Sequence, residues 1–454
     1  MRPVEPWVAT PQQAFRSTPP SAAPSYPPLR FAPSLQHSRL EPGIDLFTLD
    51  PPTPEVAVAC LVSRRAGSSN DALADEVAEI ALELMVATQG LRDATASSRL
   101  SHGRICQLSL PAQMPEVARA LVRMVAKPNL EADVKRRYAL TREGVLSARR
   151  GRGGFIRDVA HHLAFAAPLA ADRLGLLDTL TPEAIHRHTF QPDDVALFVA
   201  SSTPHEELRR TVTPIAQAWR PAPGEPLPAV AKEAELGLPD GAAEADALVF
   251  RAGAVVLAVT TKAPALGSPD EHSFAVLAHV LGEGLSSRLN RRLREEMGVT
   301  YGVDAAFVPK LDGGYLDVVA RADAEGAENA VIALHEELEK LVATPIAMSE
   351  LKAAKRGVRA SLHHAASGPL GSVAVLARYY GLRRSPEAIE DEDAAVARLT
   401  REDIQRVARV YLTQRSLSSS PLPARFARSF CAHDACPSSK PRSRTSRRRC
   451  GAER

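Results

Sequence analysis

Histidine is the commonest metal-binding side chain, and the thirteen histidines of this chain are spaced in a way that does not favour a metal site. One helix offers two imidazoles to the same ion when they lie four residues apart. The paired histidines here are adjacent or two residues apart, so a helix would point them in different directions: His161 with His162, His186 with His188, and His363 with His364. The histidines therefore predict no zinc site.

Other catalytic signatures are also missing from the sequence. It contains no Gly-x-Ser-x-Gly elbow, no Walker loop and no dinucleotide fingerprint that follows a strand. Gly282 and Gly284 come after a predicted helix, which is the wrong context for a phosphate-binding loop. These absences argue against serine hydrolase, nucleotidase and dehydrogenase chemistry.

Composition describes a globular chain of 454 residues with 45% hydrophobic content, which is enough for two or three domains with proper cores. The net charge of +3 is nearly balanced, and the chain has no run of about 18 apolar residues. We therefore expect no membrane span and no nucleic-acid partner. No apolar segment typical of a secretory signal is evident either, so the sequence assigns no compartment.

The five cysteines predict neither a disulfide framework nor a paired zinc spacing. Cys60 and Cys106 lie in apolar, strand-like stretches, and the other three lie in a polar tail. The tail also carries an arginine cluster between residues 442 and 449 that is suited to nucleic acid or anionic lipid. A solvated, disordered tail is the alternative, and it is the one we expect.

The most informative stretch is residues 281–307, LGEGLSSRLNRRLREEMGVTYGVDAAF. Two glycines break an apolar helix, and Ser286 is placed to cap a second helix that Gly298 ends. Val299, Tyr301, Val303, Ala305 and Phe307 then alternate as one face of a strand, and a glycine turn leads into another strand at residues 315–322. The stretch therefore predicts a helix, a tight turn and a hairpin.

This stretch resembles the C-terminal signature of the insulinase/pitrilysin-type zinc metallopeptidases, in which Ser-Ser-Arg-Leu, Leu-Arg-Glu, Gly and Tyr follow one another at this spacing. The resemblance implies that Arg294 and Tyr301 hold the backbone of a peptide substrate. A guanidinium and a phenol both donate hydrogen bonds to a peptide carbonyl whatever the neighbouring side chain is. Without the surrounding motif, the two residues would read as a surface arginine and a half-buried tyrosine.

The zinc motif of the same family, His-x-x-Glu-His on a helix, is absent from the first half of this chain. The matching helix is predicted at residues 71–88, where Ile80 and Leu84 take the histidine positions and Glu83 takes the position of the general base. Apolar side chains cannot ligate zinc, so we expect Glu83 to be vestigial and this chain to have no metal or other cofactor. Glu143 lies in the long helix where a third ligand would be sought, and we interpret it as one charge among many.

The two halves of the chain contain related sequences, LTPEAIHR at residues 180–187 and LTREDIQR at residues 399–406. Each reads as the start of a helix with Thr181 or Thr400 as N-cap, which implies a duplicated domain. Strands come first in each half and helices follow. The order predicts an α+β fold of two homologous domains, each a mainly antiparallel sheet with helices packed on one face, like the halves of a clamshell.

Proline-rich and glycine-rich segments mark the predicted domain boundaries. We expect a disordered lead at 1–40, an N-terminal peptidase-like domain at 41–220, a linker at 221–246, a C-terminal peptidase-like domain at 247–415 and a disordered basic tail at 416–454. In the second half nothing after Leu412 matches the apolar strand predicted at residues 195–200 of the first half.

The resemblance, together with the missing motif, points to a non-catalytic, substrate-binding subunit of a heterodimeric peptidase. The implied partners are a homologous subunit that carries the zinc and a peptide substrate. A structural or scaffold subunit with no substrate role is the first alternative. The second alternative is an active metallopeptidase with unrecognised ligands. Retention of Arg294 with Tyr301 favours the substrate-binding role, and the absent histidines weigh against an active enzyme.

Overall fold

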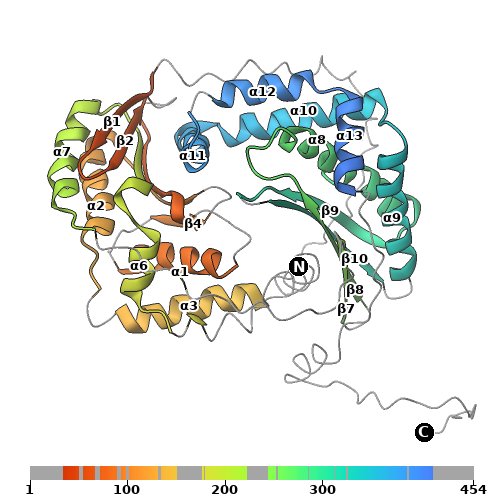
Figure 1. Ribbon diagram of the computed structural model, residues 1–454, viewed down its shortest axis with the longest axis horizontal. Coiled ribbons are helices and arrows are strands. Elements are labelled where there is room, and N and C mark those ends of the chain that lie inside the picture. The colour runs from red at the N-terminus through yellow and green to blue at the C-terminus, as the bar shows by residue number, and fades with distance from the viewer. Residues whose placement is uncertain are drawn as a thin grey trace, which may run out of the picture.

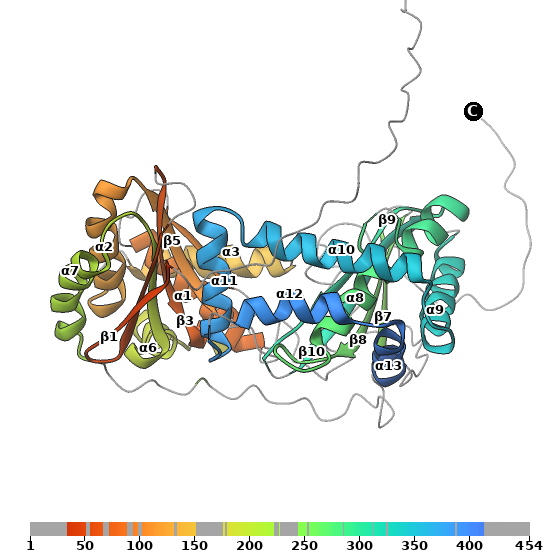
Figure 2. The same ribbon diagram turned by 90° about the horizontal axis from the view of Figure 1, so that it is seen from above.

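The structure is a computed structural model of the chain. It describes residues 34–50, 55–66, 72–88, 94–98, 102–130, 134–150, 176–177, 179–221, 227, 244–251, 254–284, 286–311, 313–323, 326–385 and 388–412. Two halves lie side by side, each with its own sheet, and helices run between them (Figures 1 and 2). The α+β class and the two-sheet organisation predicted from the sequence are confirmed.

The N-terminal sheet has the strand order β1-β2-β6-β3-β5-β4, in which only β2 and β6 pair in parallel. Its strands are β1 (Gln36–Leu40), β2 (Ile44–Leu49), β3 (Ala57–Ser63), β4 (Thr95–Ser98), β5 (Gly103–Ser109) and β6 (Val195–Ala200). β1 lies within the stretch expected to be a disordered lead. The folded domain therefore begins earlier than predicted, because β1 pairs with β2 over its whole length.

Helices cover one face of this sheet and form its main core. They are α1 (Ala72–Thr88), α2 (Met114–Ala126), α3 (Val134–Arg150), α6 (Pro182–Thr189) and α7 (His205–Ala218), with short turns η2 (Arg64–Ala66), η3 (Pro111–Gln113) and η4 (Pro192–Asp194). The predicted cap of α6 is confirmed, because the Thr181 hydroxyl accepts a hydrogen bond of 3.1 Å from the amide of Ala184. The bounds of the strands and helices predicted in this half agree within a few residues.

The C-terminal sheet has four strands in the order β7-β8-β10-β9, and all of them are antiparallel. They are β7 (Glu244–Arg251), β8 (Ala254–Ala263), β9 (Thr300–Val308) and β10 (Gly314–Asp323). β7 begins inside the predicted linker. In the N-terminal sheet β6 separates β2 from β3, whereas β7 pairs directly with β8, so the described residues contain no counterpart of β6 in this half. The basic tail lies outside them.

The helices of the C-terminal half are α8 (Glu271–Leu281), η5 (Asn290–Glu296), α9 (Ala327–Ala343), α10 (Met348–Ala365), α11 (Gly368–Gly381), α12 (Ala388–Arg398) and α13 (Arg401–Leu412). The cap at Thr400 is confirmed by reciprocal hydrogen bonds with Asp403. Helix α8 begins without a side-chain cap, and the Glu271 carboxylate accepts a hydrogen bond of 2.5 Å from the amide of Gly267.

Helix α11 belongs to the C-terminal half in sequence but packs on the N-terminal sheet, on the face opposite α1 and α2 (Figure 2). Val373, Leu376 and Tyr380 of α11 meet Val58 and Phe198 of the sheet in one apolar cluster. The helices α10 and α12 lie side by side and connect α11 to the C-terminal half. The two halves therefore share a buried core.

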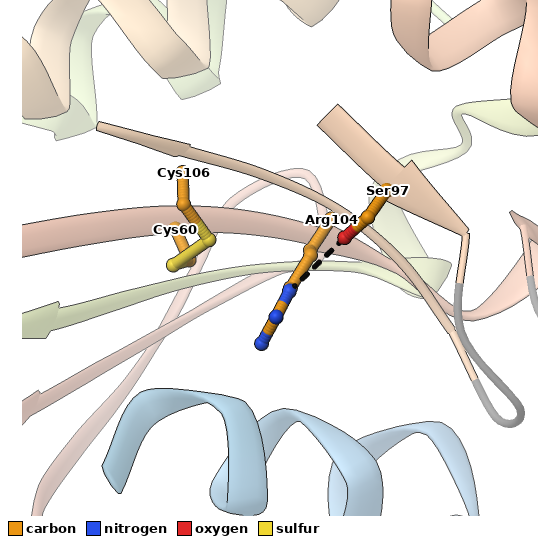
Figure 3. Close-up of a disulfide and its surroundings, with 4 residues drawn as sticks. All are labelled: Cys60, Ser97, Arg104 and Cys106. Carbon is orange, nitrogen blue, oxygen red and sulfur yellow. Dashed lines mark hydrogen bonds between the residues drawn. A yellow bond between two sulfur atoms is a disulfide. The ribbon is translucent and has the colours of Figure 1, made fainter. Parts of the chain in front are cut away.

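The same sheet face contains a disulfide between Cys60 on β3 and Cys106 on β5 (Figure 3). The two residues are directly opposite in the antiparallel register, and their Cα atoms lie 4.1 Å apart. The expectation that these cysteines form no disulfide is wrong. Two cysteines in separate strands reveal a pairing only when the register is known, which spacing along the chain does not give.

No helix within the described ranges is long and apolar enough to cross a membrane.

Truncation of Leu376 in α11 tests whether the C-terminal half stabilises the N-terminal sheet. Leu376 is fully buried, so Leu376→Ala should lower the free energy of unfolding by about 2–5 kcal/mol. Urea unfolding, followed by the fluorescence of Trp219 beyond α7 in a Trp7→Phe background, measures this loss in the N-terminal half. Ile332→Ala on the exposed face of α9 is the control. A Trp219 transition that stays unchanged in Leu376→Ala would contradict the shared core.

His186 in α6 makes the N-terminal half sensitive to acid. Burial lowers the pKa of His186 to about 4, whereas the unfolded chain has a pKa near 6.5. The unfolded state then binds more protons between these values, so stability is complete above about pH 6.5 and falls as the pH drops to 4. The loss should reach roughly 3 kcal/mol. His186→Gln should make the free energy of unfolding less dependent on pH in this range. The same pH dependence in His186→Gln and the original protein would show that His186 is not the cause.

Candidate functional site

Helix α1 is the helix on which the resemblance implies a zinc motif, and its side chains do not fit a metal. Ile80 and Leu84 are fully buried in the main core of the N-terminal half. Their hydrocarbon side chains have no lone pair to offer a cation, and a catalytic zinc needs three protein ligands. Within the described ranges, no three His, Cys, Asp or Glu side chains come together as a metal site.

Glu83 lies on the outer side of α1, and its side chain is exposed. Desolvation and the carboxylate of Glu79, one turn earlier, raise the pKa of Glu83 above the ordinary value of a glutamate. Glu143 is an exposed residue of α3, the helix that packs against α1. A raised pKa would suit a general base, but no ligated water is available to it because the ligand positions are apolar.

The predicted signature segment forms a compact unit of glycine loop, η5 and β9. η5 is a π-helix, in which the amide of Met297 bonds the carbonyl of Arg292 at 3.1 Å. Turns of this kind are rare and occur frequently at functional sites. Ser286 does not cap this segment. The adjacent Ser287 is the buried one, and its hydroxyl accepts a bond of 3.1 Å from Asn290.

The buried side chain of Asn290 fastens η5 to β9. Its Oδ1 accepts a hydrogen bond of 3.1 Å from the amide of Val303, and its Nδ2 donates one of 2.9 Å to the carbonyl of the same residue. The Nδ2 atom also reaches the carbonyl of Gly284 at 3.2 Å. One amide group therefore joins the glycine loop, the π-helix and the strand, so these three elements cannot move independently.

Two glycines allow this unit to close. A Cβ on Gly282 would lie 2.2 Å from the Cβ of Ala305, so only glycine lets the end of α8 approach β9 so closely. Gly298 has φ of +64°, a left-handed conformation that ends η5 and turns the chain into the strand. The glycine positions in the signature thus have a steric reason.

Tyr301 is 93% exposed, because β9 has a bulge at this point. Val303 pairs with Ala320 and Thr300 with Ala322, so Tyr301 and Gly302 together face one residue of β10. The Thr300 hydroxyl accepts a bond from the amide of Gly302, which supports the bulge locally. The prediction that Tyr301 shares the buried face of Val303 is therefore wrong, since a bulge shifts the alternation by one residue.

Arg294 is exposed on η5, and neither it nor Tyr301 has a hydrogen-bonding or ionic partner in the described part of the chain. Nearby arginines do have partners. Arg288 forms a two-pronged pair with Glu350, at 2.8 Å for both bonds, and Arg292 bonds Glu296 at 3.1 Å. Arg294 and Tyr301 are thus two unused donors on neighbouring, tightly joined elements.

The structure brings together the elements that carry Arg294 and Tyr301, and it places Glu83 in the other half. Sequence reasoning missed Asn290, the bulge and the pair Arg288–Glu350. Asn290 could have been found, because it lies three residues before Leu293 and next to Leu289, on the buried side of the helix. A polar residue in that position predicts a buried hydrogen-bond network.

Comparisons with known proteins agree with this architecture. A family model described as "Peptidase M16 inactive domain" matches residues 183–358. An uncharacterized zinc protease of Mycobacterium tuberculosis and its counterpart in Mycobacterium bovis are each 30% identical over 157 residues, or 34% of this chain. The match spans only 35% of the length of these curated relatives.

Solved structures show the same fold over most of the chain. A protease from Helicobacter pylori has a TM-score of 0.67 at 16% identity and covers 86% of this chain and 98% of its own. A peptidase M16 inactive domain from Pseudomonas fluorescens has a TM-score of 0.67 at 17% identity, with 84% and 95% covered. A chain of Complex III2 from Candida albicans has a TM-score of 0.64 at 12% identity, with 84% and 94% covered.

The fold and the signature unit define a peptidase-like protein built from two α+β halves. The chain is similar to the insulinase/pitrilysin-like peptidases over residues 183–358 and in its fold, and it lacks the His-x-x-Glu-His motif.

Removal of the Asn290 amide tests the role of this residue in joining η5 to β9. Asn290→Ala leaves the buried amide and carbonyl of Val303 without their partner, and each such group costs about 1–3 kcal/mol. We expect a loss of about 2–4 kcal/mol in the free energy of unfolding. Asn329→Ala on the exposed side of α9 should change it by less than about 0.5 kcal/mol. If Asn290→Ala and Asn329→Ala have the same free energy of unfolding, the Asn290 hydrogen bonds do not hold η5 on β9.

Zinc analysis tests the unsuitability of α1 for a metal. The purified chain should retain less than one zinc per molecule after dialysis and show no peptidase activity alone, because Ile80 and Leu84 cannot ligate. Elemental analysis gives the metal content. One tightly held zinc per chain, lost together with activity on chelation, would contradict this expectation.

Proposed function

We propose that this chain is the non-catalytic, substrate-binding subunit of a two-subunit insulinase-like zinc peptidase. The partner subunit would carry the His-x-x-Glu-His motif and the zinc. The present chain would contribute Arg294 and Tyr301 to binding of the peptide. Both the family description of an inactive domain and the apolar ligand positions in α1 support a role outside the chemical step.

The observation that carries the proposal is the presentation of Tyr301. Tyr301 is 93% exposed, so its side chain is not stabilised by burial. Its backbone is nevertheless held by the bulge in β9, by the hydrogen bond from the Gly302 amide to the Thr300 hydroxyl, and by the bonds of Asn290 to the strand. Rigid support of an exposed polar side chain is typical of binding sites, where pre-organisation reduces the entropy cost of binding. Arg294, likewise without a partner in the described residues, extends this donor surface on the adjacent element.

Peptide carbonyls are the groups that these two donors suit. Each hydrogen bond to a neutral carbonyl contributes about 0.5–1.5 kcal/mol, and a charged donor contributes more. Neither donor reads the peptide side chain, so binding of this type accepts many sequences. A subunit that supplies only these contacts would strengthen substrate binding, while the zinc-bearing partner performs the chemistry.

Variants of the two donors test this function in the assembled complex. With the zinc-bearing homologue from the same organism as partner, Arg294→Ala should lower kcat/KM for peptide cleavage by about tenfold, and Tyr301→Phe by less. The double variant should lose up to two orders of magnitude, about 2.7 kcal/mol. Binding of fluorescent peptide to the complex should weaken in parallel.

Arg291→Ala is the matched control, because Arg291 is an exposed arginine of the same helix. It should leave both cleavage and peptide binding within about twofold of the original protein. Failure of the two chains to copurify would refute a paired subunit. Unchanged cleavage by an intact complex of the Arg294 and Tyr301 variants would identify the chain as a scaffold instead.

A further inference from the structure

A second site lies away from Arg294 and Tyr301, where the end of α11 meets β1, β2 and η2. A pocket of about 280 Å³ opens at this contact between the two halves. We call it the junction pocket, and its lining residues are His37, Asp45, Phe47, Arg64, Tyr380, Arg383 and Arg384. The first four come from the N-terminal half, and the last three come from α11 and the turn that follows it.

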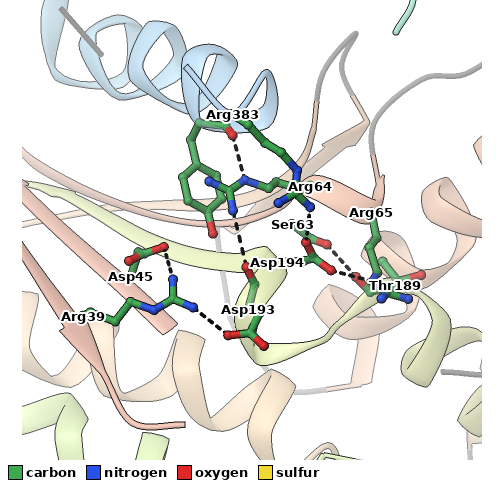
Figure 4. A network of polar contacts seen from close by, with 10 residues as sticks. Arg39, Asp45, Ser63, Arg64, Arg65, Thr189, Asp193, Asp194 and Arg383 are labelled. Carbon is green, nitrogen blue, oxygen red and sulfur yellow. Dashed lines mark hydrogen bonds and ion pairs between the residues drawn. The ribbon is translucent and has the colours of Figure 1, made fainter. Parts of the chain in front are cut away.

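Positive charge exceeds negative charge around the junction pocket (Figure 4). Arg39 bonds Asp45 at 2.8 Å and Asp193 at 2.6 Å. Asp194 is shared between Arg65 at 2.7 Å and Arg383 at 3.1 Å. These three aspartates thus already have arginine partners. In the part of the chain that the structure describes, Arg64 and Arg384 have no carboxylate partner.

Arg64 is held in place without having its charge neutralised. Its Nε donates a hydrogen bond of 2.8 Å to the carbonyl of Tyr380, and its Nη1 approaches the carbonyl of Asp193 at 3.4 Å. The Cζ atom lies 3.6 Å from the centre of the Tyr380 ring, a close cation–π contact. A fixed guanidinium with only neutral partners is a good binding site for an oxyanion.

The hydroxyl of Tyr380 is the second feature that points to a ligand. Tyr380 is only 4% exposed, and its hydroxyl has no hydrogen-bond partner among the described residues. A buried hydroxyl in this state is costly, so a hydrogen-bond partner for it would be stabilising. The ring itself is fixed edge-on against Phe47 and Phe198. The hydroxyl therefore has little freedom to turn elsewhere.

We propose that the junction pocket binds a small oxyanion, either a phosphate or a compact carboxylate. Arg64 and Arg384 would supply charge, and the Tyr380 hydroxyl would donate a hydrogen bond to the same anion. The pocket is slightly smaller than typical pockets for drug-sized ligands, which suits a small anion. Since its walls come from both halves, a bound anion strengthens the docking of α11 on the N-terminal sheet.

Thermal unfolding of the full chain tests this site, with inorganic phosphate in one series and citrate in the other at constant ionic strength. A saturable rise in Tm with either anion supports the site, and the anion that is effective identifies the chemistry. No rise with either anion, or an equal rise with sodium chloride, overturns it. Salt screening alone gives no saturation at a defined concentration.

Two variants separate binding from folding. Tyr380→Phe removes only the hydroxyl, so Tm without anion should stay equal or rise, while the anion concentration for half saturation increases severalfold. Arg384→Gln should raise the anion concentration for half saturation at least tenfold. It should have little effect on Tm without anion, since the Arg384 side chain has no polar partner in the described residues. Arg291→Gln on η5 is the control. Saturation at the original concentration in both pocket variants would refute the assignment.

Discussion

The contact of α11 with the N-terminal sheet is the interaction on which the rest of this structure depends. Every residue of β3 and β6 is buried, so these strands need cover on both faces. The helices of their own half supply it on one side only. α11 supplies the other, and Leu376, Val373 and Tyr380 complete the core although they lie far from both strands along the chain. The relative placement of the halves follows from this packing.

The signature unit depends on a smaller but equally specific set of contacts. Gly282 lets α8 approach β9, and Asn290 closes the approach with hydrogen bonds on both sides of Val303. Together they fix η5 and β9, which carry Arg294 and Tyr301. On α1, by contrast, Ile80 and Leu84 belong to the core. The chain thus presents two donors rigidly, while the positions at which the resemblance implies zinc ligands serve packing.

The sequence predicts well those features that depend on local periodicity and capping. The strand at residues 195–200, the helix at Ala72–Thr88 and the cap at Thr181 all agree with the structure, since hydrophobic spacing and cap chemistry act over a few residues. The related stretches at residues 180–187 and 399–406 predicted the two-half architecture. Features that depend on contacts far apart in sequence were not predictable in the same way. They include the Cys60–Cys106 disulfide, the docking of α11 and the junction pocket.

Tyr301 shows a third situation, in which a local rule gives the wrong answer. Strict alternation places it with Val303 and Ala305 on the buried face. One extra residue in β9 reverses its direction, and only the partner register reveals that residue. The family signature singles out Arg294, and the structure adds that this residue has no partner in the described part of the chain while the arginines around it do. For both residues, the decisive information is in three-dimensional neighbours.

The position of β9 has a further consequence for the behaviour of the protein in concentrated solution. β9 is an outer strand of its sheet, and outer strands with free backbone groups tend to pair with other molecules and aggregate. The bulge at Tyr301 interrupts the regular edge, and the exposed carboxylate of Asp304 adds a charge that a pairing strand would have to bury. The same irregularity that turns the tyrosine outward therefore also helps to keep this edge from joining a second sheet.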